Sequence, residues 1–372
     1  MSHPVASMCR QRSSTPDQVW APMLVNRPKR MSLSSSRVSR GGAARAPGAI
    51  VRRAGRSVKP RPRLDGRARA RAVSRRHPIL DFPREERMTY DIEIEDVEYL
   101  RHGDRPLLAR LFKPRGSGPF PLVVELHGGA WCRGNRLNDS PINEPLAKSG
   151  VVVAALDFRM PPEAPYPASV ADINYAIRLL KTRATALGSR PDLVGVLGTS
   201  SGAHQAILVG MRPHDRRYAA IPLPAGLPAA DASVRCAVLC WPVIDPLARY
   251  HYVKKLKAGG PPYPEVVDRV LPCHDQFWQT EEAMAEGNPV QALERGERVA
   301  LPPVLYLQGT RDQAHPRADL DRFVARYRAV GGEVELELFE GESEGFIIRN
   351  PSSPAAVRAV EKIVEFVRKR IW

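Results

Sequence analysis

The chain is poor in the features that mark metal, disulfide and membrane proteins. Five cysteines among 372 residues show no metal-ligand spacing and cannot all pair: Cys9, Cys132, Cys236, Cys240 and Cys273. With no histidine-rich or carboxylate cluster either, we expect neither a metal nor a cofactor. No run of about 18 apolar residues exists, so no membrane span is predicted. A secretory segment is also missing. The cysteine usage therefore indicates a reducing, cytoplasmic compartment.

Acidic residues are scarce at the beginning of the chain and nowhere else. Residues 1–87 hold 21 of the 56 Lys and Arg but only 5 of the 40 Asp and Glu, so the remaining residues carry 35 of each sign. The net charge of +16 thus belongs entirely to the leader. We expect a neutral body that does not bind nucleic acid.

The leader 1–87 lacks apolar periodicity and is rich in Arg, Ser, Ala and Pro. Such a composition cannot offset chain entropy by burial, so we expect disorder. It is compatible with an organelle transit peptide, with a basic tail that contacts anionic partners, or with an upstream extension of the reading frame. We favour the extension, with the folded unit beginning at Met88 and an edge strand near 89–97.

The segment Gly198-Thr199-Ser200-Ser201-Gly202 fits the Gly-x-Ser-x-Gly pattern of a nucleophile elbow. An apolar run, 193–197, precedes it and predicts a buried strand, and 203–208 can continue as a helix. The glycines are needed because a sharp strand-to-helix turn leaves no room for a larger residue. Ser200 is therefore the candidate nucleophile.

A second motif, His127-Gly128-Gly129-Ala130-Trp131, follows the apolar run 121–126. Acyl transfer places negative charge on the former carbonyl oxygen, and backbone N–H groups can reach it only where small residues allow a close approach. We expect the amides of Gly129 and Ala130, with that of Ser201, to form this oxyanion hole.

Apolar runs and helical patterns alternate through the rest of the chain. Strands are expected at 151–157, 236–241, 303–308 and 334–339, and helices at 172–181, 318–330 and 355–370. Such alternation predicts an α/β fold with a mostly parallel sheet covered by helices on both faces.

These motifs resemble the α/β-hydrolase superfamily, most closely its esterase and lipase branch with a His-Gly-Gly-x-Trp oxyanion motif. The resemblance covers about residues 91–371, including the proline-rich 161–167 before Asp172 and the segments 241–246 and 308–312. The family's order of serine, acid and histidine implies that Asp312 is the triad acid.

The resemblance fails where the family keeps its histidine, because the loop after the last expected strand reads Glu344-Gly345-Phe346 instead of His-Gly-Phe. Imidazole suits proton transfer with its pKa of about 6.5, whereas a glutamate starts at about 4.3. Glu344 would need burial or a shared proton with Asp312 to act as the base. His315 is the alternative base, His204 is expected to pack, and loss of activity is the third interpretation.

A small cap is expected at about 247–298, inserted into the hydrolase domain 88–372. Packing of the cap onto the sheet is the favoured role for each of its aromatic residues taken singly, and lining an acyl or aryl pocket is the alternative: Tyr250, Tyr252, Tyr263, Phe277 and Trp278. Buried packing is expected for Cys236 and Cys240, and also for Cys132.

The sequence thus predicts a serine hydrolase of the carboxylesterase type that cleaves a small-molecule ester through an acyl-enzyme. The alternative is a catalytically impaired ligand-binding protein of the same fold. The sequence indicates neither the substrate nor the oligomeric state.

Overall fold

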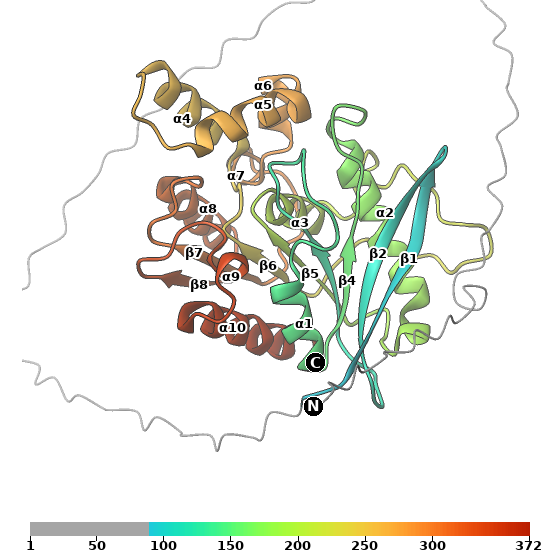
Figure 1. Ribbon diagram of the computed structural model, residues 1–372. Coiled ribbons are helices and arrows are strands. Elements are labelled where there is room, and N and C mark those ends of the chain that lie inside the picture. Colours follow the sequence, from blue (N-terminus) through green and yellow to red (C-terminus); the bar gives the residue numbers. More distant parts are fainter. Residues whose placement is uncertain (1–88) are drawn as a thin grey trace, which may run out of the picture. The chain divides into compact units, whose positions relative to one another are not determined.

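A computed structural model describes residues 89–372, and the leader 1–87 lies outside them. An eight-stranded sheet has the order β1-β2-β4-β3-β5-β6-β7-β8 (Figure 1). The hairpin β1–β2 is antiparallel, β2 pairs antiparallel with β4, and the other neighbouring strands are parallel. The strands are β1 (Ile92–His102), β2 (Arg105–Pro114), β3 (Leu122–Leu126), β4 (Val152–Leu156), β5 (Val194–Thr199), β6 (Ala237–Cys240), β7 (Val304–Gly309) and β8 (Val334–Phe339).

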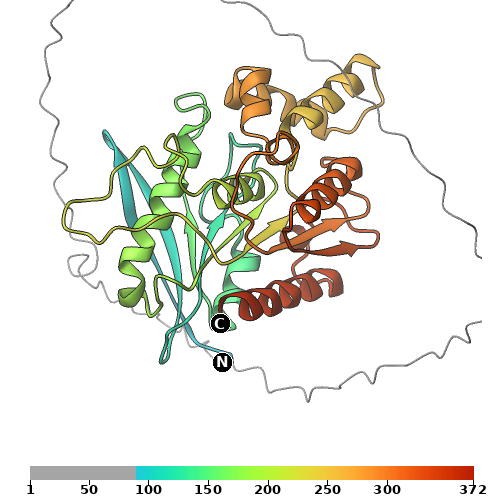
Figure 2. The ribbon, with the colours of Figure 1, turned by 180° about the vertical axis from the view of Figure 1, so that it is seen from behind.

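Helices cover both faces of this sheet (Figures 1 and 2). One hydrophobic core joins the sheet to α2 (Ala168–Arg183), α3 (Ser201–Met211) and α8 (Arg317–Ala329). The other joins it to α1 (Ser140–Lys148), α9 (Phe346–Arg349) and α10 (Pro354–Ile371). Side chains of β3 alternate between the two cores, with Leu122, Val124 and Leu126 in the first and Val123 in the second. A short 3₁₀ turn, η1 (Ala184–Leu187), follows α2.

Four helices lie between β6 and β7: α4 (Pro246–Ala258), α5 (Val266–Trp278), α6 (Glu281–Glu286) and α7 (Pro289–Glu294). In Figure 1, α4, α5 and α6 stand above the sheet, on the side of the loop after β3. Val253 of α4 and Val270 of α5 pack with Ala130 of that loop. This segment corresponds to the expected cap at 247–298 and brings side chains of α4 and α5 to the Ser200 region.

The expected α/β class is confirmed: every strand and helix predicted beyond residue 100 is present, most ends shifting by one to four residues. The edge strand β1 runs from Ile92 to His102, so it begins within the stretch 89–97 where its start was predicted. Strand β2, helix α1, the turn η1 and helix α9 were not predicted, and the cap was predicted without its individual helices. Within residues 89–372, no helix is long and apolar enough to cross a bilayer.

Candidate active site

Ser200 lies at the corner between β5 and α3 with φ 49° and ψ −116°, outside the ordinary regions for a non-glycine residue. Glycine is required on both sides of Ser200, at positions 198 and 202. A Cβ on Gly202 would collide with the carbonyl oxygens of Leu126 and His127, and one on Gly198 would collide with the backbone of Gly202. Ser200 is only 6% exposed, but it lines a cavity. The serine is thus held in a strained turn and faces open space.

The loop after β3 turns sharply beside Ser200. Gly129, Ala130 and Trp131 all have positive φ, at 121°, 53° and 64°. The amide of Gly128 donates to Thr199 Oγ1 at 2.9 Å, and that of Trp131 donates to Ser201 Oγ at 3.0 Å. These two bonds fix the loop against the elbow.

The backbone N–H groups between these two hydrogen bonds are left without an acceptor in the part of the chain that the structure describes. The N–H groups of Gly129, Ala130 and Ser201 donate to no acceptor within residues 89–372. Gly129 and Ala130 line the same cavity as Ser200. This arrangement is the one expected of an oxyanion hole. His127 is instead buried, with its ring stacked on Phe158 at a centroid distance of 4.3 Å.

A hydrogen-bonded chain leads away from the serine. Ser200 Oγ lies 3.2 Å from His315 Nε2, and His315 Nδ1 lies 2.9 Å from Asp312 Oδ2. The other carboxylate oxygen of Asp312 accepts the amides of Ala314, at 2.8 Å, and His315, at 3.0 Å. Gln308 Nε2 donates to the His315 carbonyl at 2.8 Å. Acid and imidazole therefore share one short loop after β7, and the loop itself aims the ring at Ser200.

The electrostatic environment of Asp312 favours its ionised form. Burial alone would raise the pKa of Asp312, but the His315 charge, the hydrogen bond from its ring and the two amide bonds outweigh burial and hold the pKa below its usual value. A carboxylate at Nδ1 keeps the Nδ1–H tautomer and leaves Nε2 free to accept the serine proton.

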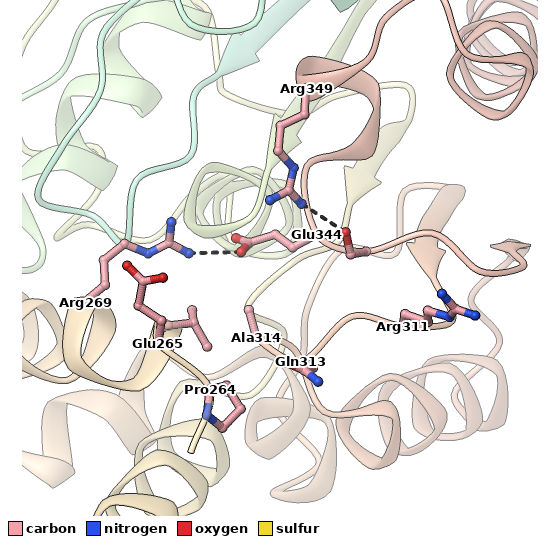
Figure 3. A pocket seen from close by; sticks show the side chains of 10 residues that line it. Pro264, Glu265, Arg269, Arg311, Gln313, Ala314, Glu344 and Arg349 are labelled. Atoms are coloured by element: carbon pink, nitrogen blue, oxygen red, sulfur yellow. Dashed lines mark hydrogen bonds and ion pairs between the residues drawn. The ribbon is translucent and has the colours of Figure 1, made fainter. Parts of the chain in front are cut away.

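Glu344 is close to the serine but is engaged elsewhere. Its Oε1 is 3.5 Å from Ser200 Oγ, which is a marginal distance, and its Oε2 is 3.0 Å from Arg269 Nη2 of α5 (Figure 3). Asp312 meanwhile bonds His315 and backbone amides. The hypothesis that the two carboxylates share a proton has no support in this geometry.

His204 packs, as expected. Its Nδ1 accepts from Trp131 Nε1 at 3.2 Å, and its Nε2 donates to the Gly287 carbonyl at 2.8 Å. Burial, partly opposed by that second bond, lowers the pKa of His204 to about 4. A fully buried, neutral imidazole thus links the 127–131 loop to the helices between β6 and β7.

The cavity beside Ser200 has a volume of about 160 Å³. It is lined by Gly129, Ala130, Arg133, Ser200, Arg249, Arg269, Val270 and Glu344. A second cavity of about 290 Å³ shares Arg269 and Glu344 with it and continues between α5 and the loops after β7 and β8 (Figure 3). The serine therefore opens onto charged walls.

None of the five candidate aromatic side chains lines either cavity, which agrees with the packing role favoured for each of them singly. Phe277 and Trp278 are buried and pack on Trp131, Phe277 at a ring distance of 5.2 Å and Trp278 at 5.5 Å. Tyr250 and Tyr263 direct their hydroxyls to Asp275 and Asp268, and Tyr252 packs among the apolar side chains between α4, α5 and the oxyanion loop. Arg249 of α4 and Arg269 of α5 line the cavity instead, and no pattern in the local sequence predicts this.

The cysteines behave as predicted where the structure describes them. Cys236 and Cys240 are buried in and beside β6, and Cys132 is partly buried with its thiol 3.6 Å from the Cys273 carbonyl. All four are free thiols, and Cys9 lies outside the described residues.

Comparisons with known proteins agree with this architecture. The BD-FAE family model matches residues 111–245. Esterase LipC of Mycobacterium tuberculosis is 28% identical over 239 residues, which cover 63% of this chain and 55% of LipC. Isoprenylcysteine alpha-carbonyl methylesterase ICME of Arabidopsis thaliana is 25% identical over 257 residues, covering 65% of this chain and 55% of ICME. The chain thus spans about half the length of the curated relatives it matches.

Solved structures show the same fold. An esterase of Pyrobaculum calidifontis superposes with a TM-score of 0.61 at 23% identity, covering 75% of this chain and 86% of that one. The thermostable carboxylesterase EstE1, cloned from a metagenomic library, gives 0.61 at 22% identity, covering 76% and 91%. The chain thus shares the α/β-hydrolase fold of these esterases, and its sequence similarities support a relationship to the esterase and lipase branch of that family.

Proposed function

We propose that the chain is a carboxylic-ester hydrolase with Ser200 as nucleophile, His315 as general base and Asp312 as the acid that orients it. The observation that carries the proposal is the hydrogen-bonded chain from Ser200 Oγ through His315 to Asp312, at 3.2 and 2.9 Å. The relatives' names, which include esterase, carboxylic ester hydrolase and methylesterase, support the same chemistry.

The geometry supports a two-step acyl transfer. His315 Nε2 takes the proton of Ser200 as Oγ attacks the ester carbonyl, and Asp312 stabilises the imidazolium that forms. The amides of Gly129, Ala130 and Ser201 donate to the tetrahedral oxyanion. His315 then protonates the leaving alcohol, and a water activated by the same imidazole releases the acid from the serine.

Glu344 is not the base in this proposal. Its carboxylate is paired with Arg269 at 3.0 Å and reaches Ser200 Oγ only at 3.5 Å, whereas an imidazole lies closer. The pseudoenzyme alternative arose from the missing histidine after β8. A histidine three residues beyond the acid supplies the function that this alternative assumed to be lost.

We also propose a small ester as substrate and a reducing, cytoplasmic compartment. The free thiols of the four cysteines within residues 89–372 support the second point.

The test compares Ser200→Ala, His315→Gln and Glu344→Gln on short-chain 4-nitrophenyl esters. We expect Ser200→Ala and His315→Gln to lower kcat by about 10⁴-fold, and Glu344→Gln by about tenfold or less. A serine-directed phosphonate should label the wild type and not Ser200→Ala. Wild-type turnover that persists in Ser200→Ala, or a His315→Gln variant as active as the wild type, would refute the proposal.

A further inference from the structure

The cavity at Ser200 has an unbalanced charge. Three guanidinium groups line it, those of Arg133, Arg249 and Arg269, against the single carboxylate of Glu344. Arg269 and Glu344 neutralise each other through their 3.0 Å contact. Arg133 Nη2 donates to the Arg269 carbonyl at 3.1 Å and to Cys273 Sγ at 3.8 Å. Hydrogen bonds from Cys132 and from Arg133 lower the pKa of Cys273 to about 6, so Arg133 has a partner that ionises near neutral pH. Of the three guanidinium groups, only that of Arg249 has no hydrogen-bonded or ion-paired partner within residues 89–372.

Arg249 of α4 is the most unusual of the three. It is only 2% exposed, and its Nε and Nη1 atoms are buried without any hydrogen-bond partner. No carboxylate within residues 89–372 forms an ion pair with it; the buried Asp245 at the start of α4 pairs with Arg322 instead, at 2.9 Å. Burial lowers the pKa of Arg249 to about 10, which leaves the group charged at neutral pH.

An unpaired buried cation is costly, and proteins keep such groups paired as a rule. The elements that bury Arg249 are those that build the site. The guanidinium lines the cavity together with Ser200 and the two glycine-loop residues Gly129 and Ala130. The missing partner is therefore expected to enter this cavity from outside the protein, where it also meets the nucleophile.

We propose that the substrate is a short ester that carries a carboxylate near the scissile bond, and that Arg249 binds this carboxylate while Ser200 attacks the ester carbonyl. This inference rests on the proposed esterase function. Guanidinium and carboxylate match in shape and charge, and a buried pair of this kind gives strong charge-assisted hydrogen bonds.

The size and the charge of the cavity restrict the class of substrate further. A cavity of about 160 Å³ holds a small acid but not a long acyl chain. A doubly charged phosphate would face the Glu344 carboxylate in the same wall, whereas one carboxylate matches the one unpaired guanidinium of Arg249. The remainder of the substrate extends into the adjoining cavity, whose wall adds Arg311 and Arg349 (Figure 3).

The kinetic test compares the mono-4-nitrophenyl ester of glutaric acid with 4-nitrophenyl pentanoate, a neutral ester of similar length. We expect wild-type kcat/KM to favour the anionic ester at least tenfold. Arg249→Met should lower the ratio of the two kcat/KM values by about 10- to 150-fold, the range for a hydrogen bond to a charged group. Arg358→Met removes an exposed charge on α10, 66% accessible, and should leave the ratio unchanged.

A second ester set places the carboxylate on the alcohol side. Acetyl esters of short hydroxy acids, compared with acetyl esters of neutral alcohols, determine which side of the bond Arg249 recognises. A preference in either set that depends on Arg249 supports the inference. Equal rates for charged and neutral esters in both sets overturn it.

A binding measurement keeps the inference testable if Arg249→Met fails to fold. Glutarate should inhibit wild-type hydrolysis of the neutral ester competitively and should stabilise Ser200→Ala against heat, while glutaramide should do neither. If inorganic phosphate inhibits more strongly than glutarate, the carboxylate assignment is wrong. If no ester is hydrolysed but glutarate still binds Ser200→Ala, the esterase proposal fails and the anion site stands.

Discussion

Protonation of the buried His204 is expected to destabilise the fold at acid pH, and the size of the effect follows from its contacts. The imidazole is neutral because Nδ1 accepts from Trp131 and Nε2 donates to Gly287. The pKa is about 4 in the folded chain and about 6.5 in the unfolded one. Between these values the unfolded chain binds more protons, so the free energy of unfolding falls as the pH falls.

Each pH unit across this window costs about 1.4 kcal/mol for one proton, so the full loss between pH 6.5 and 4 is about 3 kcal/mol. The buried His127 and His274 also have lowered pKa values and add to the total, so the contribution of His204 has to be isolated by a variant. His204→Gln is suitable, because an amide can accept from the indole and donate to the carbonyl without titrating.

The assay is urea denaturation of the wild type and His204→Gln between pH 7.5 and 4. At neutral pH we expect the wild type to be more stable by about 1 to 2 kcal/mol, since the amide fills the site less well. This advantage should shrink as the pH falls and should reverse below pH 5. Parallel stability curves for the two proteins across the whole range would refute the reasoning.

Two further outcomes are expected. Gly202→Ala should give no folded protein or a loss of more than about 4 kcal/mol in urea denaturation, because the new Cβ collides with the backbone after β3; a soluble variant with wild-type stability would contradict the close approach of β3 and α3. Glu344→His alone should not raise esterase kcat, since His315 already bonds Ser200, but in the inactive His315→Ala background it should restore at least tenfold over that background. A large gain in the single variant would instead identify residue 344 as the natural position of the base.

Much of the fold is predictable from the sequence because its signals are local. The buried strands are apolar runs, and the glycines around Ser200 and in the 127–131 loop are required by close backbone contacts. Strand β2 was missed although Leu107, Ala109 and Leu111 alternate inward. Helix α1 was missed because Pro141 and Pro145 are typical of loops, and here one of them lies in its first turn.

The site could be predicted only in part. The proposed nucleophile, acid and oxyanion amides follow from motifs and chain order, whereas the direction of the His315 ring depends on hydrogen bonds that no sequence pattern reveals. Asp312 has to accept two amides of its own loop, and Gln308 has to hold the His315 carbonyl. Arg249 lines the same cavity as Ser200 only because α4 returns over the sheet, which is a tertiary effect.

Asp312 and His315 lie on one four-residue stretch, and this placement has a consequence for how the chain can evolve. In the usual family arrangement two separate loops must keep their mutual alignment, so neither can change freely. In the mechanism proposed here the loop after β8 takes no part in proton transfer, so residue 344 can change with the molecule that enters the cavity. The residues for proton transfer then lie in the loop after β7, and a residue for substrate selectivity lies in the loop after β8. One loop can therefore diverge while the other is preserved.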